Sequence, residues 1–166
     1  MTVEAEVLNE LHRLRSRLPE LTGALAAGAD GLVLAQDMPD VQPEGLAALT
    51  AAALGVGRRM VDLAARGEFR ELLVRGAGGC LATYAAGPSA VLTLLADDGT
   101  NIGRLHLEGR RSGARIAELV AGRSADDRPA VRRGEPPTSP PAPSQAHGRI
   151  LGALPVRIPP QSRYHP

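Results

Sequence analysis

The segment Ala90-Val-Leu-Thr-Leu-Leu-Ala96 decides the fold class of this 166-residue chain. Apart from Thr93 the segment is apolar, so both of its alternating faces are apolar. Successive side chains of a β-strand point to opposite faces, and a strand of this composition therefore has to be covered on both sides. The segment predicts a strand inside a sheet that carries helices front and back.

Two further strands are predicted just upstream, at residues 68–75 and 80–86. The turn Gly76-Ala-Gly-Gly79 joins them, and Gly87-Pro88 leads into the strand at 90–96. The first turn lacks the Lys and the Ser or Thr of a phosphate-binding loop, so it predicts no nucleotide site. Cys80 is the single cysteine, which excludes an internal disulfide, and its place in a strand favours an inert core thiol.

The first 35 residues predict a helix followed by an antiparallel pair of strands. The apolar residues of the helix recur at steps of three and four: Val3, Val7, Leu11, Leu14 and Leu18. Pro19 ends this helix. Two apolar runs follow, at 21–27 and 32–35, and Asp30-Gly31 between them supplies the positive φ angles of a tight hairpin.

The middle of the chain predicts the best-defined helix. Pro43 suits the first helical turn, and Glu44 lies near the positive end of the helix dipole. The apolar positions, which we expect to face the sheet, follow at alternating steps of three and four: Leu46, Leu49, Ala53, Val56, Met60 and Leu63.

A closing helix is predicted from Thr100 or Asn101 to Ala121, with Gly122 as its terminator. Its expected inward residues are Leu105, Ile116, Leu119 and Val120. The element order is helix, two strands, helix, three strands, helix. The fold class is therefore an α/β (α+β) sandwich around a mainly antiparallel sheet.

The composition changes sharply near Gly122. Ten of the 14 prolines lie beyond it, and the net charge changes from −3 for residues 1–122 to +4 for residues 123–166. We expect a folded domain at 1–122 and a disordered Pro/Arg-rich tail at 123–166. An apolar stretch at 150–158 is either a chance feature of this tail or a segment that docks on a partner or on the domain.

Charge and composition argue against several classes of function. All 19 basic residues are Arg, but the domain itself is acidic and contains only two aromatics, Phe69 and Tyr84, so nucleic-acid binding is not expected. No apolar segment approaches the roughly 20 residues of a membrane span, so we expect a soluble, cytoplasmic protein. His12, His106, His147 and His165 show no metal-ligand spacing. No set of reactive residues converges, which predicts neither enzymatic activity, nor a cofactor, nor a metal.

The middle helix also carries a stripe of small residues, completed by an arginine: Ala48, Ala51, Ala52, Gly55 and Arg59. Gly55 and Gly57 each cost about 1 kcal/mol relative to Ala, and a helix that tolerates this cost usually lets another element come close. The stripe predicts a two-fold dimer interface. Alanine enrichment from a high-GC genome, on a solvated face, is the alternative.

Charged residues on the same helix and after it are candidates for partner binding: Arg58, Arg59, Asp62 and Arg66. Arginine is enriched at protein interfaces because its planar guanidinium can hold a carboxylate with two parallel hydrogen bonds. The alternative is that these arginines only complement the helix dipole on a solvated surface.

The run Leu21-Thr-Gly-Ala-Leu-Ala-Ala-Gly-Ala-Asp-Gly-Leu-Val-Leu-Ala35 resembles the opening hairpin of the Roadblock/dynein light chain family, which includes the bacterial MglB proteins. The Ala-rich helix with Gly57-Arg-Arg-Met60 also fits, as do Glu68-Phe-Arg-Glu-Leu-Leu-Val-Arg75 and Asn101-Ile-Gly-Arg-Leu105, in the form found in actinobacterial members. The resemblance covers residues 3–121. It rests on a whole-domain pattern and not on a catalytic motif.

This resemblance implies a five-stranded antiparallel sheet with the middle helix on one face and the terminal helices on the other. It implies homodimers, or heterodimers with a related Roadblock protein, in which the middle helices lie side by side and the sheets become continuous. It further implies a regulator or scaffold for a small Ras-like GTPase, which actinobacteria often encode together with a sensor histidine kinase. The alternative is a small-molecule sensor domain of the PAS or GAF type, although such a domain usually lines its cavity with aromatics.

Overall fold

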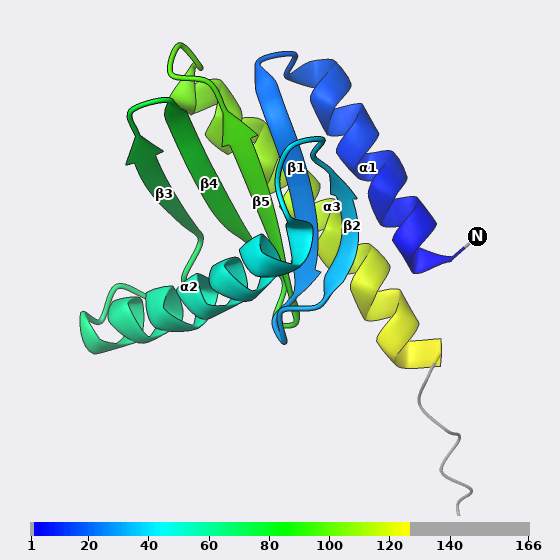
Figure 1. Cartoon of the computed structure of the whole chain (residues 1–166). Helices are drawn as coiled ribbons and strands as arrows, with labels where there is room; N and C mark the ends of the chain where they lie inside the picture. The colour runs from blue at the N-terminus through cyan, green and yellow to red at the C-terminus, as the bar shows by residue number, and fades with distance from the viewer. Residues whose placement is uncertain (1, 127–166) are drawn as a thin grey trace, which may run out of the picture. The chain divides into compact units, whose positions relative to one another are not determined.

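The computed structural model describes residues 2–126 of the chain. The predicted tail lies outside these residues from position 127 onward, and with it the apolar stretch at 150–158. Eight elements follow one another (Figure 1): α1 (Val3–Arg17), β1 (Leu21–Gly28), β2 (Val33–Asp37), α2 (Pro43–Leu63), β3 (Glu71–Gly76), β4 (Gly79–Ala86), β5 (Ala90–Ala96) and α3 (Ile102–Asp126). This is the predicted order.

The five strands form one antiparallel sheet in the order β2-β1-β5-β4-β3. β5 is the central strand, and all of its residues except the half-buried Leu95 are buried. The two-sided burial predicted from its composition is confirmed. Thr93, its polar residue, lies opposite Thr83 of β4, and the two buried hydroxyls are 3.3 Å apart, so each has a hydrogen-bonding partner.

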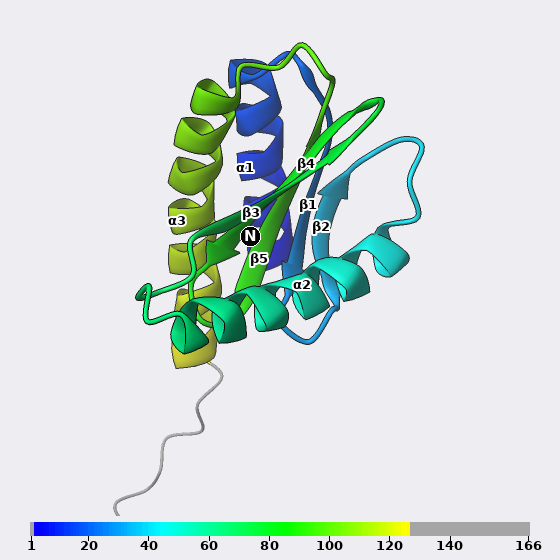
Figure 2. The same ribbon diagram turned by 90° about the vertical axis from the view of Figure 1, so that its left-hand side faces the viewer.

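The helices cover the two faces of the sheet as the resemblance implies. Figure 2 shows α1 and α3 on one side and α2 on the other. Each face has its own apolar core. The core under α1 and α3 contains Leu11, Leu14, Tyr84, Leu92, Leu105 and Ile116, and the smaller core under α2 contains Leu25, Ala47, Leu54 and Val91.

The turns explain where several elements begin and end. Of the predicted turn residues, Gly31 has a positive φ of 84° and Asp30 does not. The N–H of Gly28 donates to the carbonyl of Leu32 at 2.8 Å, which closes the predicted β1–β2 hairpin. After α2 the chain turns through Ala65 and Gly67, with φ angles of 51° and 83°. The connection continues through residues 68–70, which the sequence pattern assigned to a strand, so β3 begins three residues later than predicted.

α3 differs from its prediction at one end only. The side-chain Oδ1 of Asn101 accepts a hydrogen bond from the N–H of Arg104 at 3.0 Å, which confirms Asn101 as a capping residue. The expected stop at Gly122 is wrong, since α3 continues to Asp126. Gly122 does not adopt the positive φ of a helix-ending glycine, and a glycine inside a helix costs only about 1 kcal/mol.

A buried polar network joins α1 to α3. Arg17 binds Glu108 at 2.7 Å, Glu10 at 3.1 Å and the hydroxyl of Ser112 at 2.9 Å. Ser112 in turn donates to Glu10 at 2.7 Å. Glu10 and Ser112 are buried, so these bonds supply the partners that their polar atoms would otherwise lack.

Four of the six α2 positions predicted to face the sheet are exposed, whereas Leu46 and Ala53 are half-buried. Leu49, Val56, Met60 and Leu63 are 69%, 60%, 64% and 72% exposed. The buried positions of α2 are instead Ala47, Thr50, Leu54 and Gly57. Both sets repeat at helical spacing, and the set with smaller side chains lets the helix come closer to the sheet. At Gly57 the ring of Phe69 occupies the space that a Cβ would need.

The two glycines of α2 should therefore respond in opposite ways to alanine. We expect Gly55→Ala to stabilise the fold by about 0.5–1 kcal/mol, because nothing lies within 4 Å of its added Cβ. Gly57→Ala should destabilise the fold, because overpacking against Phe69 costs about 1–3 kcal/mol. Urea unfolding of both variants measures the difference. Equal stabilisation by both would show that the Phe69 ring yields without cost.

Candidate partner-binding surface

The outer side of α2 is an exposed apolar surface. Its side chains are four of the six that the sequence pattern placed inside: Leu49, Val56, Met60 and Leu63. Val74 of β3 is also 51% exposed. Large apolar side chains gathered on one element of a soluble domain are typical of an interaction site.

This surface continues from α2 onto β3. Met60 and Leu72 line one open depression of about 640 Å³, together with Phe69. Leu72 and Val74 alternate along β3 with Leu73, which packs against the core under α1 and α3, so both point to the α2 side of the sheet. The C-terminal end of α2 projects past β3 (Figure 1). The apolar surface thus overhangs an open edge of the sheet.

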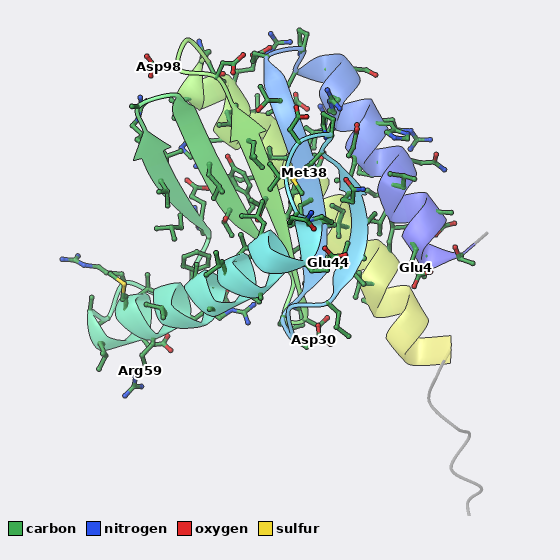
Figure 3. The ribbon with its side chains drawn as sticks, viewed as in Figure 1. Glu4, Asp30, Met38, Glu44, Arg59 and Asp98 are labelled. Atoms are coloured by element: carbon green, nitrogen blue, oxygen red, sulfur yellow. The ribbon has the colours of Figure 1, made fainter. Side chains whose placement is uncertain are left out.

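The predicted small-residue stripe is also open to solvent. Ala48, Ala52, Gly55 and Arg59 are exposed, and Ala51 is half-buried. Figure 3 shows Arg59 pointing away from the sheet. The structure therefore places the stripe beside the exposed apolar side chains, on the side of α2 that faces away from the core. Its role as a dimer interface stays a prediction.

The four predicted partner-binding residues have different surroundings. The Arg58 guanidinium donates to the carbonyl oxygens of Gly87 and Pro88, at 2.9 and 3.2 Å, and so holds the β4–β5 turn. Arg59, Asp62 and Arg66 are exposed. The last three are free to contact a partner, whereas Arg58 already serves a contact within the chain.

An open groove of about 710 Å³ runs between α2, the β4–β5 turn and α3. Arg58 and Asp62 line it on one side and Arg110 on the other, with Phe69 and Tyr84 between them. Its walls thus mix aromatic rings with charges of both signs.

Beside this groove lies a polar cluster that the sequence pattern did not reveal. Arg110 of α3 binds both carboxylate oxygens of Glu71 at 2.6 Å, and His106 Nδ1 lies 3.0 Å from the Tyr84 hydroxyl. Glu71 lies directly opposite Tyr84 in the sheet, and the Tyr84 ring fits against α3 at Gly109. The four-residue spacing of His106 and Arg110 was the one available signal, because it places both on one helix face.

Charge and burial shift two pKa values in this cluster. The hydrogen bonds from Arg110 lower the pKa of Glu71 below its ordinary value of 4.5, partly opposed by burial. Burial raises the pKa of Tyr84, and the nearby Glu71 charge adds to that rise. Tyr84 therefore stays protonated, and its O–H remains available for the hydrogen bond with His106.

Three other features bear on function in the described part of the chain: metal ligands, membrane-spanning helices and the thiol of Cys80. Among residues 2–126, no group of three His, Cys, Asp or Glu side chains is placed to hold a metal ion. Within the same residues no helix is both long enough and apolar enough to cross a membrane. Cys80 is buried in β4 as a free thiol, as the sequence pattern predicted.

Comparison with known proteins defines the class. The Roadblock/LC7 domain matches residues 7–96, more than half of the chain, and the chain belongs to this family. The protein MJ1340 of Methanocaldococcus jannaschii is 28% identical over 114 residues, covering 68% of this chain and 96% of that protein.

Two solved structures share the fold. A structure of MglB with a tetrameric arrangement has a TM-score of 0.67 at 23% identity and covers 74% of this chain and 93% of its own. The Roadblock/LC7 domain from Streptomyces avermitilis has a TM-score of 0.64 at 22% identity, with coverage of 69% and 97%.

The Glu71–Arg110 pair predicts an acid-sensitive contribution to stability. A carboxyl whose pKa is lowered by folding stabilises the protein above its unfolded value, here 4.5, and that stabilisation is lost as the pH falls through the folded value. We expect Arg110→Met to remove this loss below pH 4.5, so its stability should depend less on pH there than that of the unmodified chain. Urea midpoints from neutral pH to pH 3 measure it, with the neighbouring Arg111→Met as the control. If the urea midpoints of the parent and of Arg110→Met fell by the same amount as the pH was lowered, the Glu71–Arg110 pair would not be the source of this acid sensitivity.

Proposed function

We propose that this protein is a non-enzymatic, dimeric scaffold that binds a small Ras-like GTPase in the bacterial cytoplasm and modulates its nucleotide cycle or its location. The observation that carries the proposal is the exposed apolar surface of α2 in a domain of the Roadblock/LC7 family. The fold similarity to MglB supports it. A sensor histidine kinase system is a further candidate partner.

Dimerisation would cover the apolar side chains of α2. Leu49, Val56, Met60 and Leu63 lie on the same outer side of the helix as the small residues Ala48, Ala52 and Gly55. Small residues let a second helix approach, and the larger apolar side chains supply the area that a stable interface has to bury. The tetrameric arrangement of MglB shows that a protein of this fold self-associates. We assign Ala48, Ala51, Ala52, Gly55 and Arg59 to the interface together with these apolar residues.

The GTPase would contact the C-terminal end of α2. Arg59, Asp62 and Arg66 are exposed there and can exchange hydrogen bonds and charge with a partner. Arg58 would act through the β4–β5 turn that it holds in place. A PAS- or GAF-like sensor is not favoured, because the chain belongs to the Roadblock/LC7 family.

Affinity capture tests the partner. The full-length protein is immobilised, and native lysate is passed over it with GDP and then with a non-hydrolysable GTP analogue. We expect mass spectrometry to find a small GTPase retained in one nucleotide state more than in the other. Reconstitution from the two purified proteins then checks that the contact is direct. Failure of any GTPase to bind in either state would overturn this function and leave the fold unaffected.

The oligomeric state tests the interface. We expect Val56→Glu with Met60→Glu to convert the dimer to a monomer, because the new carboxylates would be buried without partners. Ala52→Glu with Gly55→Glu should do the same and abolish GTPase binding. Leu107→Glu is the matched control, since Leu107 is 65% exposed on α3, away from this surface. Light scattering coupled to gel filtration measures the mass, and a dimer that survives both double substitutions excludes α2 as the interface.

A further inference from the structure

The open groove of about 710 Å³ between α2, the β4–β5 turn and α3 does not share a side of α2 with the exposed apolar residues. Arg58 lines the groove and is two positions along the helix from Val56 and from Met60. With about 3.6 residues per turn, a step of two residues leads to the opposite side of a helix. A dimer formed through the apolar surface would therefore use the other side of α2.

The size and shape of the groove suit an extended peptide segment better than a small molecule. Its volume falls within the range of about 300–1,000 Å³ that is usual for ligand pockets. A pocket for a small molecule encloses most of its ligand, whereas this groove is open to solvent. An extended peptide can lie in an open groove with alternate side chains directed inward and the others left in water.

The groove has an apolar centre that is already in place. Phe69 and Tyr84 line it, and Phe69 is half-buried, so part of its surface is accessible. The Phe69 ring packs against α2 at Gly57. The Tyr84 ring packs against α3 at Gly109. Both rings are thus fixed before any ligand arrives, and an apolar side chain would pack on them at little cost in ordering.

Four charged side chains line the groove without forming a salt bridge. α2 contributes Arg58 and Asp62, and the connection from α2 to β3 contributes Glu68 and Arg70. None of the four takes part in a salt bridge within residues 2–126. The Arg58 guanidinium donates to two backbone carbonyl oxygens, which are neutral. Each of the two segments therefore offers the groove one positive and one negative charge that has no salt-bridge partner in the described chain.

This mixture of charges selects among ligands. A segment with acidic side chains alone would pair with the two arginines and be repelled by the two acids, and a basic segment would meet the reverse. A segment with one charge of each sign finds a partner for both. Arginine suits the acidic side chain, because its planar guanidinium can hold a carboxylate with two parallel hydrogen bonds.

We propose that this groove binds an extended peptide segment of a partner protein in which an acidic and a basic side chain flank an apolar residue. The acidic side chain pairs with Arg58 or Arg70, and the basic one pairs with Asp62 or Glu68. The apolar side chain packs on Phe69. This site goes beyond the proposed function, because it does not require the partner to be a GTPase or the chain to be a dimer.

Four short peptides test the charge rule. Two are mixed, Gly-Glu-Leu-Arg-Gly and Gly-Arg-Leu-Glu-Gly, and two are like-charged, Gly-Glu-Leu-Glu-Gly and Gly-Arg-Leu-Arg-Gly, all acetylated and amidated to remove the terminal charges. Phe69 is the only phenylalanine in the chain, so its ring signals in the NMR spectrum report on the groove alone. We expect one of the mixed peptides to shift these signals and to bind about fivefold more tightly than either like-charged peptide, because it forms two exposed ion pairs and meets no repulsion.

A charge-reversed groove is the second arm of the test. Asp62→Arg with Glu68→Arg makes all four charges positive, so the doubly acidic peptide should become the tightest binder. Both residues are exposed, and the fold should tolerate the change. Asp97→Arg with Asp98→Arg is the matched control, since it alters the net charge equally in the exposed β5–α3 turn, and Figure 3 shows Asp98 at the end of the sheet away from α2. The control should keep the preference for the mixed peptide.

The proposal is overturned if no peptide moves the Phe69 ring signals, or if mixed and like-charged peptides bind equally. An unchanged preference after the groove reversal has the same meaning. A control pair that changes the preference in the same way also overturns it, because the net charge of the chain, and not the groove, would then select the peptide. Failure to capture a GTPase does not bear on these outcomes, so the two proposals fail separately.

Discussion

The burial of β5 on both faces is the constraint on which the rest of this structure depends. Its apolar side chains reach into two separate cores, one under α1 and α3 and the other under α2. Neither helical layer could be absent without exposing half of this strand to water. Its one polar residue, Thr93, is accommodated because Thr83 of the neighbouring strand provides a hydrogen-bonding partner in the same buried plane.

α2 covers one face of the sheet and at the same time presents apolar side chains to solvent. The helix approaches the sheet through Ala47, Thr50 and Leu54, and at Gly57 it leaves room for the ring of Phe69. Leu49, Val56, Met60 and Leu63 are directed outward. In an isolated chain this arrangement exposes apolar area to water, whereas in an assembly the same area becomes an interface. The fold and the proposed interaction thus use opposite sides of one helix.

The sheet edge near β3 is organised by contacts that cross from strand to helix. Arg110 of α3 binds Glu71 of β3, and His106 of α3 contacts Tyr84 of β4. Glu71, the first residue of the edge strand, is therefore bonded to α3. These contacts fix the start of the edge strand relative to α3.

The sequence by itself determined the order of the elements, the burial of β5 on both faces, the β1–β2 hairpin and the start of α3 near Thr100 or Asn101. These features depend on residue periodicity and on turn and capping chemistry, which act between neighbours in the chain. The tertiary structure alone decided which side of α2 is buried, where β3 begins, that α3 continues through Gly122, and that Glu71 meets Arg110. α2 carries two stripes of helical spacing, and only the shape of the sheet and the position of Phe69 select between them. Contacts between residues far apart in the chain leave no local pattern, and for that physical reason they had to be read from the folded molecule.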